Sequence, residues 1–210
     1  MNYELEYKDE LGNKKSASIT AEDSKEALRN DYEELLRRYN PDIVKFQRLQ
    51  TKAGEAMHLK ITVTAPTHYL ASSTDTSPKA CDSMDIHIIC YPGYPLKSVS
   101  VHYNADHYLA SPNVFRSGSA CIDKWVPFTS SLISVVDKLI RDTIHDPNVT
   151  RYLSPANSSM IKWHMKGVES GKFPTIMPKL LYAPEHRALP PRRVAEISTV
   201  PVRSLPSRRH

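Results

Sequence analysis

The 210-residue chain is poor in cysteine and glycine and has no long apolar run. Its three cysteines, Cys81, Cys90 and Cys121, are odd in number and widely spaced, which argues against a disulfide framework and favours a reducing cytoplasm. No apolar stretch approaches the ~18 residues of a transmembrane helix. The first residues, MNYELEYKDELGNKK, lack the charged-then-apolar pattern of a signal peptide. The sequence therefore predicts a soluble, cytoplasmic protein that makes no contact with a membrane.

Positive charge is concentrated at the C-terminal end. The formal net charge is +5, and residues 185–210 contain six arginines and two glutamates, so the first 184 residues carry only +1. A nucleic-acid binder should carry basic residues interleaved with aromatic ones on a folded face. That pattern is absent, so nucleic acid is not an expected partner.

Metal and cofactor motifs are also missing. The nine histidines form no HxxxH spacing, and the cysteines form no CxxC spacing. His87 and Cys90 are three residues apart in a predicted strand, so they point to opposite faces of it. The six glycines form no phosphate-binding loop. We therefore expect no metal and no cofactor in this chain.

The first 40 residues predict a hairpin followed by a helix. Residues 2–8 alternate apolar and polar side chains, DELGN supplies a turn, and KSASI supplies a weaker return strand. We therefore assign residues 1–20 to an N-terminal hairpin extension. Thr20 or Ser24 is expected to cap the helix, and Pro41 ends it. The apolar residues at helical spacing are Leu28, Tyr32, Leu35, Leu36 and Tyr39.

Strand-like runs follow this helix in close succession. Their short spacing predicts an antiparallel meander. The Ser/Thr-rich stretch ASSTDTSPKACDS, between the second and third runs, is expected to be a mobile loop. The four runs are residues 43–49, 57–64, 84–90 and 99–103.

Two helices and a proline-rich tail complete the pattern. TSSLISVVDKLIRDTI predicts a second helix with a wide apolar stripe, and a third helix is expected near residues 157–168. Prolines recur from Pro174 onward, so residues 173–210 are expected to form an extended or disordered tail. This order of elements predicts an α+β fold with helices segregated from an antiparallel sheet.

The stretch SPNVFRSGSACID, at residues 111–123, places Cys121 eight residues after Asn113 in a loop of small and polar side chains. A loop thiolate attacks acyl carbon and holds the product as a thioester, which amines can still attack. The Asn113 amide would donate to the oxyanion that forms, and losing one such donor costs ~10²–10³ in rate. Gly118 would leave room for an extended acyl chain. A lone cysteine is, however, more often a small buried hydrophobe.

The order of motifs around this loop resembles that of the ubiquitin-conjugating enzymes. YPGYPLKSVSV is similar to the family's Tyr-Pro step into its fourth strand, and WVPFTSSLISVVDKLI is similar to its downstream Trp, Pro and helix. Asp146-Pro147-Asn148 ends that helix as the family's Asp-Pro-Asn does. The resemblance covers roughly residues 24–168. The positions that match the family's His-Pro-Asn signature and its active cysteine, eight residues beyond the Asn, are Pro112, Asn113, Gly118, Cys121 and Asp123.

This resemblance implies a ubiquitin-conjugating-like catalytic domain over residues 21–172. Its order is an N-terminal helix, a four-stranded antiparallel meander, an active-site loop and then helices. Cys121 would accept the C-terminus of a ubiquitin-like protein from an activating enzyme and pass it to an amine on a target, with Asn113 facing the oxyanion. The activating enzyme consumes the ATP, and the family's first helix meets that enzyme.

Some positions depart from the family pattern. Ser111 replaces the signature His, whose role is to shape the loop together with Pro112 and Gly118. Many members have an acidic residue after Asp-Pro-Asn that helps to receive the incoming lysine, whereas VTRYLS here offers Arg151 and no carboxylate. The segment after Cys121 is shorter than usual, a proline pair is missing, and no fourth helix is evident. These traits resemble divergent bacterial members encoded beside ubiquitin-like proteins and activating enzymes, for which antiviral defence is an implied role.

Titratable residues near this loop are candidates for moving a proton or orienting the amine. An Asp before Pro-Asn often only builds a turn, which weakens the case for Asp146. His145 closes the second helix, and His102 and His107 are further imidazoles that could approach Cys121 and favour its thiolate. Plain solvent-exposed histidines are the alternative. The carboxylates considered are Asp123, Asp142 and Asp146.

Three functions remain open at this point. The first is a thioester-carrying conjugating enzyme whose modifier and target the sequence does not name. The second is a non-catalytic module on the same fold that binds ubiquitin-like proteins, which the missing His and missing acidic residue favour. The third is a cysteine hydrolase, which would need a histidine base paired to Cys121.

Overall fold

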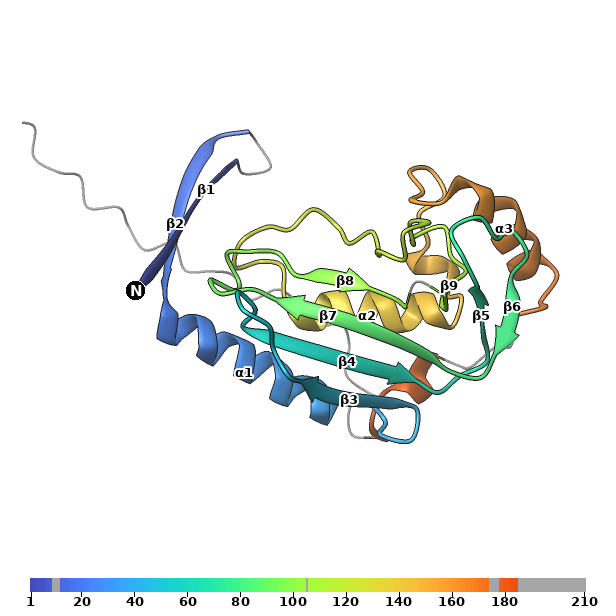
Figure 1. Cartoon of the computed structure of the whole chain (residues 1–210), viewed down its shortest axis with the longest axis horizontal. Helices are drawn as coiled ribbons and strands as arrows, with labels where there is room; N and C mark the ends of the chain where they lie inside the picture. The colour runs from blue at the N-terminus through green and yellow to red at the C-terminus, as the bar shows by residue number, and fades with distance from the viewer. Residues whose placement is uncertain (9–11, 105, 174–177, 185–210) are drawn as a thin grey trace, which may run out of the picture.

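The computed structural model describes residues 1–8, 12–104, 106–173 and 178–184. This part of the chain is a mixed α+β structure with three α-helices and with antiparallel sheets of two, four and three strands (Figure 1). The expected α+β class with antiparallel sheets is therefore confirmed. None of the helices described is long and apolar enough to cross a membrane.

The N-terminal hairpin stands beside the main sheet and leads into the first helix (Figure 1). Strands β1 (Asn2–Lys8) and β2 (Lys14–Thr20) pair antiparallel. Helix α1 (Ala21–Arg38) begins directly after β2. Of the two expected caps, the structure selects Thr20, whose side chain accepts a hydrogen bond from the Asp23 backbone N–H at 3.1 Å.

The central sheet has four antiparallel strands in the order β3-β4-β7-β8. In β4 and β7 buried side chains alternate with half-buried ones, so one face of the sheet enters the core. This is the alternation that the sequence shows at these positions. The strands are β3 (Val44–Leu49), β4 (Met57–Val63), β7 (Met84–Cys90) and β8 (Ser100–His102).

Helix α2 (Leu132–Thr143) carries the apolar stripe expected for it, and its buried residues join the same core as the sheet. A reciprocal capping box between Ser131 and Ser134 starts it. Leu139 and Ile140 lie on the buried face of the helix, while Lys138 lies at its edge. Residues 134, 135, 138 and 139 of the helix line a cavity together with the segment that contains Cys121.

A second, three-stranded sheet was not foreseen. Strands β5 (Thr67–Leu70), β6 (Lys79–Cys81) and β9 (Tyr108–Leu109) pair in the order β6-β5-β9. The stretch expected to be one polar loop thus contains β6. Runs of two to four residues are too short for periodicity to reveal, and the β5–β9 pairing joins residues far apart in the sequence.

The C-terminal part contains short helical turns and helix α3 (Ile161–Glu169). The turns are η1 (Pro147–Val149), η2 (Ser158–Met160) and η3 (Pro178–Leu181).

Residues 178–184 belong to the stretch expected to be an extended or disordered tail, and in the structure they dock on the end of α1. The Asn40 N–H donates to the Leu181 carbonyl at 2.8 Å, and Leu181 is fully buried. These contacts join residues far apart in the sequence, so the local composition of residues 173–210 does not reveal them. Residues 185–210 of the expected tail lie outside the described residues.

Candidate functional site

The segment from Asn113 to Cys121 closes into a tight loop. The Cys121 N–H donates to the Asn113 carbonyl at 2.8 Å, and Val114 forms an isolated bridge with Ala120. At the tip, the Phe115 N–H donates to the Ser119 carbonyl at 2.8 Å. The backbone therefore brings the two ends of the eight-residue spacing side by side.

Gly118 is required by the turn at the tip of this loop. Its φ is +82°, and an added Cβ would lie 3.2 Å from the Tyr103 carbonyl oxygen. A residue with a side chain would be strained in this conformation. The expected role of Gly118 in shaping the loop thus has a local physical reason, whereas its role in admitting an acyl chain stays a prediction.

Cys121 is partly buried and lines a cavity of about 70 Å³ between the loop and α2. Its Sγ lies 3.8 Å from the Ile122 carbonyl oxygen. No histidine in the described part of the chain hydrogen-bonds to this thiol; His102 instead pairs with Ser119 Oγ at 3.3 Å, and His107 stacks on Tyr69. The other side chains lining the cavity include Trp125, Val135, Lys138 and Leu139.

Lys138 brings a largely buried amine into this cavity. Its side chain is 17% exposed, and Nζ lies 3.2 Å from both carboxylate oxygens of Asp123. Burial lowers the pKa of Lys138, against the opposing influence of Asp142 and Cys121. Arg151 forms a second ion pair with Asp123. The Asp123 carboxylate is therefore held between two cations.

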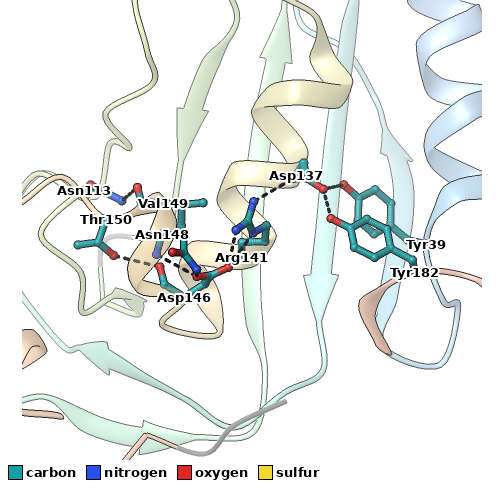
Figure 2. Close-up of polar contacts among 9 residues, drawn as sticks. All are labelled: Tyr39, Asn113, Asp137, Arg141, Asp146, Asn148, Val149, Thr150 and Tyr182. Carbon is teal, nitrogen blue, oxygen red and sulfur yellow. Dashed lines mark hydrogen bonds and ion pairs between the residues drawn. The ribbon is translucent and has the colours of Figure 1, made fainter. Parts of the chain in front are cut away.

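Asn113 is buried, and each polar atom of its side-chain amide has a partner. Nδ2 donates to Asp142 Oδ1 at 3.1 Å and to the Val149 carbonyl at 3.1 Å, while Oδ1 accepts from the Arg151 N–H at 3.0 Å. Figure 2 shows the contact with Val149. The amide thus ties the Cys121 loop to the segment that follows α2, and both of its protons are in use.

Ser111 and Asp142 form a buried pair beneath the loop. The Ser111 hydroxyl donates to the two Asp142 oxygens at 2.8 and 2.9 Å, and its Oγ accepts from the Asn113 N–H at 3.1 Å. Burial raises the pKa of Asp142 to about 7, although the hydrogen bonds from Ser111 and Asn113 and the charge of Lys138 favour ionisation. Ser111 therefore holds the loop through hydrogen bonds on both sides.

Pro112 fixes the opposite side of the loop. Its carbonyl accepts hydrogen bonds from the Ala156 N–H at 2.8 Å and the Asn157 N–H at 3.0 Å. The segment before α3 is thereby attached directly to the residue preceding Asn113.

Asp146 builds the turn after α2. Burial opposes its ionisation, but hydrogen bonds from Asn148 and the Arg141 guanidinium, whose Nε is 2.7 Å away, outweigh this effect and lower the pKa of Asp146. Arg141 also lies 3.8 Å from Asp137. Asp137 in turn accepts hydrogen bonds from Tyr39 and Tyr182 (Figure 2). These contacts are the ones expected of an aspartate that builds a turn and takes no part in proton transfer.

His145 belongs to a different group of side chains, the histidine cluster, whose members are His68, His145, Trp163, His164 and Phe173. Its Nε2 lies 3.1 Å from His68 Nδ1, and its ring stacks on Phe173 with centroids 4.1 Å apart. Burial, with the neighbouring His164 and His68, lowers the pKa of His145 to about 3. Its contacts are thus made to β5 and α3, whereas Asn113, Asp142 and Ser111 gather at the Cys121 loop.

Lys138 is the site residue that sequence analysis overlooked. It precedes Asp142 by four residues and follows Val135 by three, so helical spacing puts it on the same face as both. Because Asp142 is already a candidate, this spacing was enough to identify Lys138 as a further site residue. From the sequence, Arg151 stands out only because a carboxylate is missing there, and its pairing with Asp123 is seen only in the structure.

Comparison with known proteins adds no assignment to this site. No protein-family model and no curated protein matches the chain. Within the ranges that the structure covers, no group of three or more His, Cys, Asp or Glu is arranged to hold a metal ion. What the chain does must therefore be argued from the Cys121 loop itself.

Proposed function

We propose that the chain is a conjugating enzyme for a ubiquitin-like protein, with the fold of the ubiquitin-conjugating family. The observation that carries the proposal is the closed loop in which Cys121 donates its N–H to Asn113, within the motif order that resembles this family. The succession of α1, a four-stranded antiparallel sheet, this loop and α2 supports it.

The proposed reaction is two successive acyl transfers. The Cys121 thiolate attacks the carbonyl carbon of the thioester between the modifier's C-terminus and the activating enzyme's cysteine, whose thiolate leaves. An amine of the target then attacks the new thioester, Cys121 departs as thiolate, and the amine proton passes to solvent. An Asn113 amide proton would stabilise the oxyanion in each step.

Asp123 is the carboxylate suited to orient the incoming amine. It is 60% exposed and lies beside the Cys121 cavity, whereas Asp142 is buried and Asp146 is committed to its turn. Lys138 and Arg151 hold Asp123 in place. We assign Asp123 a positioning role toward the acceptor.

The activating enzyme is proposed to dock on α1. The exposed face of this helix carries ion pairs three residues apart, Lys25 with Glu22 and Arg29 with Glu26, and both pairs are largely exposed. Exposed pairs of this kind contribute little to folding stability. Their charged groups are therefore available for ion pairs with a partner protein. Charge reversal at Lys25 and Arg29 should slow thioester formation without affecting discharge.

The test is to incubate the full chain with a ubiquitin-like protein, its activating enzyme and ATP. A covalent adduct that is cleaved by thiols should appear by mass spectrometry. Cys121→Ala should abolish it. Cys81→Ala is the matched control, because Cys81 is also partly exposed but lies outside the loop, and this variant should load normally. An adduct that persists in Cys121→Ala would refute the proposal.

A binding module on the same fold is the second candidate, and the Asn113 contacts favour it. Both amide protons of Asn113 are already used, so neither is free to meet an oxyanion in this conformation. Alkylation of the native chain with iodoacetamide separates the two functions. Cys121 should react faster than Cys81 in a thioester carrier, and an unreactive Cys121 would favour the binding module.

A further inference from the structure

Asp142 is a buried carboxylate for which the proposed transfer reaction has no direct use. Its side chain is enclosed between α2 and the Cys121 loop, and the residue is only 2% exposed. Among the described residues no ion pair reaches it; its hydrogen-bond partners are the Ser111 hydroxyl and the Asn113 amide. A buried carboxylate held only by neutral donors is costly, which raises the question of what it does.

Asp142 accepts one of the two side-chain amide protons of Asn113. An amide nitrogen carries two protons, and those of Asn113 go to Asp142 Oδ1 and the Val149 carbonyl, both at 3.1 Å. The bond to Asp142 is charge-assisted when that carboxylate is ionised, and such bonds are about twice as strong as neutral ones. The charge on Asp142 therefore decides how firmly the amide is held.

We propose that Asp142 is a positioning residue that latches the Asn113 amide, and that protonation of Asp142 releases this amide to serve the acyl group on Cys121. The catalytic consequence rests on the proposed function, whereas the latch itself does not. Ser111 is part of the latch because it donates to Asp142 and accepts from the Asn113 N–H.

The pH at which the latch opens follows from the groups facing Asp142. Lys138 on its own helix favours ionisation, while Asp146, beyond the helix, opposes it. The tyrosines that face it, Tyr103 after β8 and Tyr152 after η1, both have a raised pKa and stay neutral near pH 7. With burial dominant and the pKa of Asp142 at about 7, the latch changes state within the physiological range.

The direct test follows the Asn113 side-chain amide by NMR on the full ¹⁵N-labelled chain between pH 5.5 and 8.5. The resonance is identified by its loss in Asn113→Ala. It should titrate with a midpoint near 7 in the wild type and lose this titration in Asp142→Asn. The matched control is Asp137→Asn on the same helix, which should keep it. A resonance that does not titrate, or that titrates unchanged in Asp142→Asn, would overturn the latch.

Ser111→Ala gives a second measurement that does not depend on Asp142→Asn being well folded. This variant keeps the Asp142 carboxylate but removes a hydrogen-bond donor that favours its ionisation. The midpoint of the Asn113 amide titration should therefore move to higher pH. An unchanged midpoint would contradict the geometry on which the latch depends.

The effect of the latch on catalysis is tested by measuring how fast hydroxylamine discharges the Cys121 thioester at pH 8. About one-tenth of Asp142 would be protonated there, so Asp142→Asn should discharge up to ~10-fold faster. In an Asn113→Ala background the gain should vanish, because Asp142 acts through Asn113. Equal discharge rates for the wild type and Asp142→Asn would show that release of the Asn113 amide does not control the reaction. If no thioester forms at all, the proposed function fails, while the NMR titration still decides the latch.

Discussion

Single residues in the Cys121 loop are constrained by backbone and by buried hydrogen bonds at the same time. Gly118 permits the turn because it adopts a positive φ where a Cβ would crowd the Tyr103 carbonyl. Ser111 is small enough to fit between Asp142 and the Asn113 backbone, and it satisfies both. Both residues therefore help to set the shape of the loop that contains Cys121.

Replacing Gly118 with Ala should destabilise the fold by ~2–3 kcal/mol, because the positive φ and the close carbonyl both oppose a side chain. Gly54→Ala is the control, since Gly54 has a similar φ of +85° but open space around it, and its cost should be ~1 kcal/mol. The free energies of unfolding are measured with urea. Equal costs would show that the contact with Tyr103 contributes nothing.

Among the elements, α3 and β5 are joined through the histidine cluster. His164 is fully buried and its Nδ1 lies 2.9 Å from the Tyr152 hydroxyl. Its ring also packs at 5.3 Å from that of Phe173. Burial lowers the pKa of His164 to about 4, so the packed imidazole is neutral. The attachment of α3 should therefore weaken when the imidazoles are forced to accept protons.

The pH dependence of stability should reveal this attachment. Because the pKa of His164 is lower in the folded chain than in the unfolded chain, the unfolded chain binds more protons between pH 4 and 6.5. The contribution of His164 to stability is complete above this interval and is lost as the pH falls through it. Between pH 7 and pH 5 this loss is about 2 kcal/mol.

His164→Phe removes this loss, so its free energy of unfolding should gain about 2 kcal/mol relative to the wild type on going from pH 7 to pH 5. Asp142, whose pKa is raised, acts in the opposite direction, but it is common to both chains and cancels in the difference. Urea titrations at the two pH values measure the effect. A difference between the chains that does not change with pH would contradict a buried neutral His164.

Across the whole molecule, segments distant in sequence close around α1 and α2. Leu181 joins the core, and the Tyr182 ring stacks on Tyr39 with centroids 5.5 Å apart. Both tyrosine hydroxyls donate to Asp137 on α2 (Figure 2). Residues 178–184 therefore bind the two helices together.

Leu181→Ala should lower the free energy of unfolding by ~2–5 kcal/mol, since it removes a fully buried side chain from the core. The adjacent Leu180 is 38% exposed, and Leu180→Ala should cost well under half as much. Thermal or urea unfolding of the full chain measures both. Similar effects for the two variants would mean that the segment does not dock as described.

Periodicity and spacing were enough to determine the main elements of this protein. The helical stripe of residues 28–39 and the alternation in residues 57–63 and 84–90 are local patterns that burial of one face imposes. The proximity of Asn113 and Cys121 was also foreseeable, because a short loop of small residues folds back on itself.

Tertiary structure decided the partners of the buried polar groups and the short pairings. Asn113 was expected to face an oxyanion, yet its amide protons bond to Asp142 and Val149, which only the packing of α2 brings near. His145 turns toward α3 for the same reason. A buried polar side chain must find a partner wherever the fold supplies one, and that partner is set by contacts between segments that no local pattern encodes.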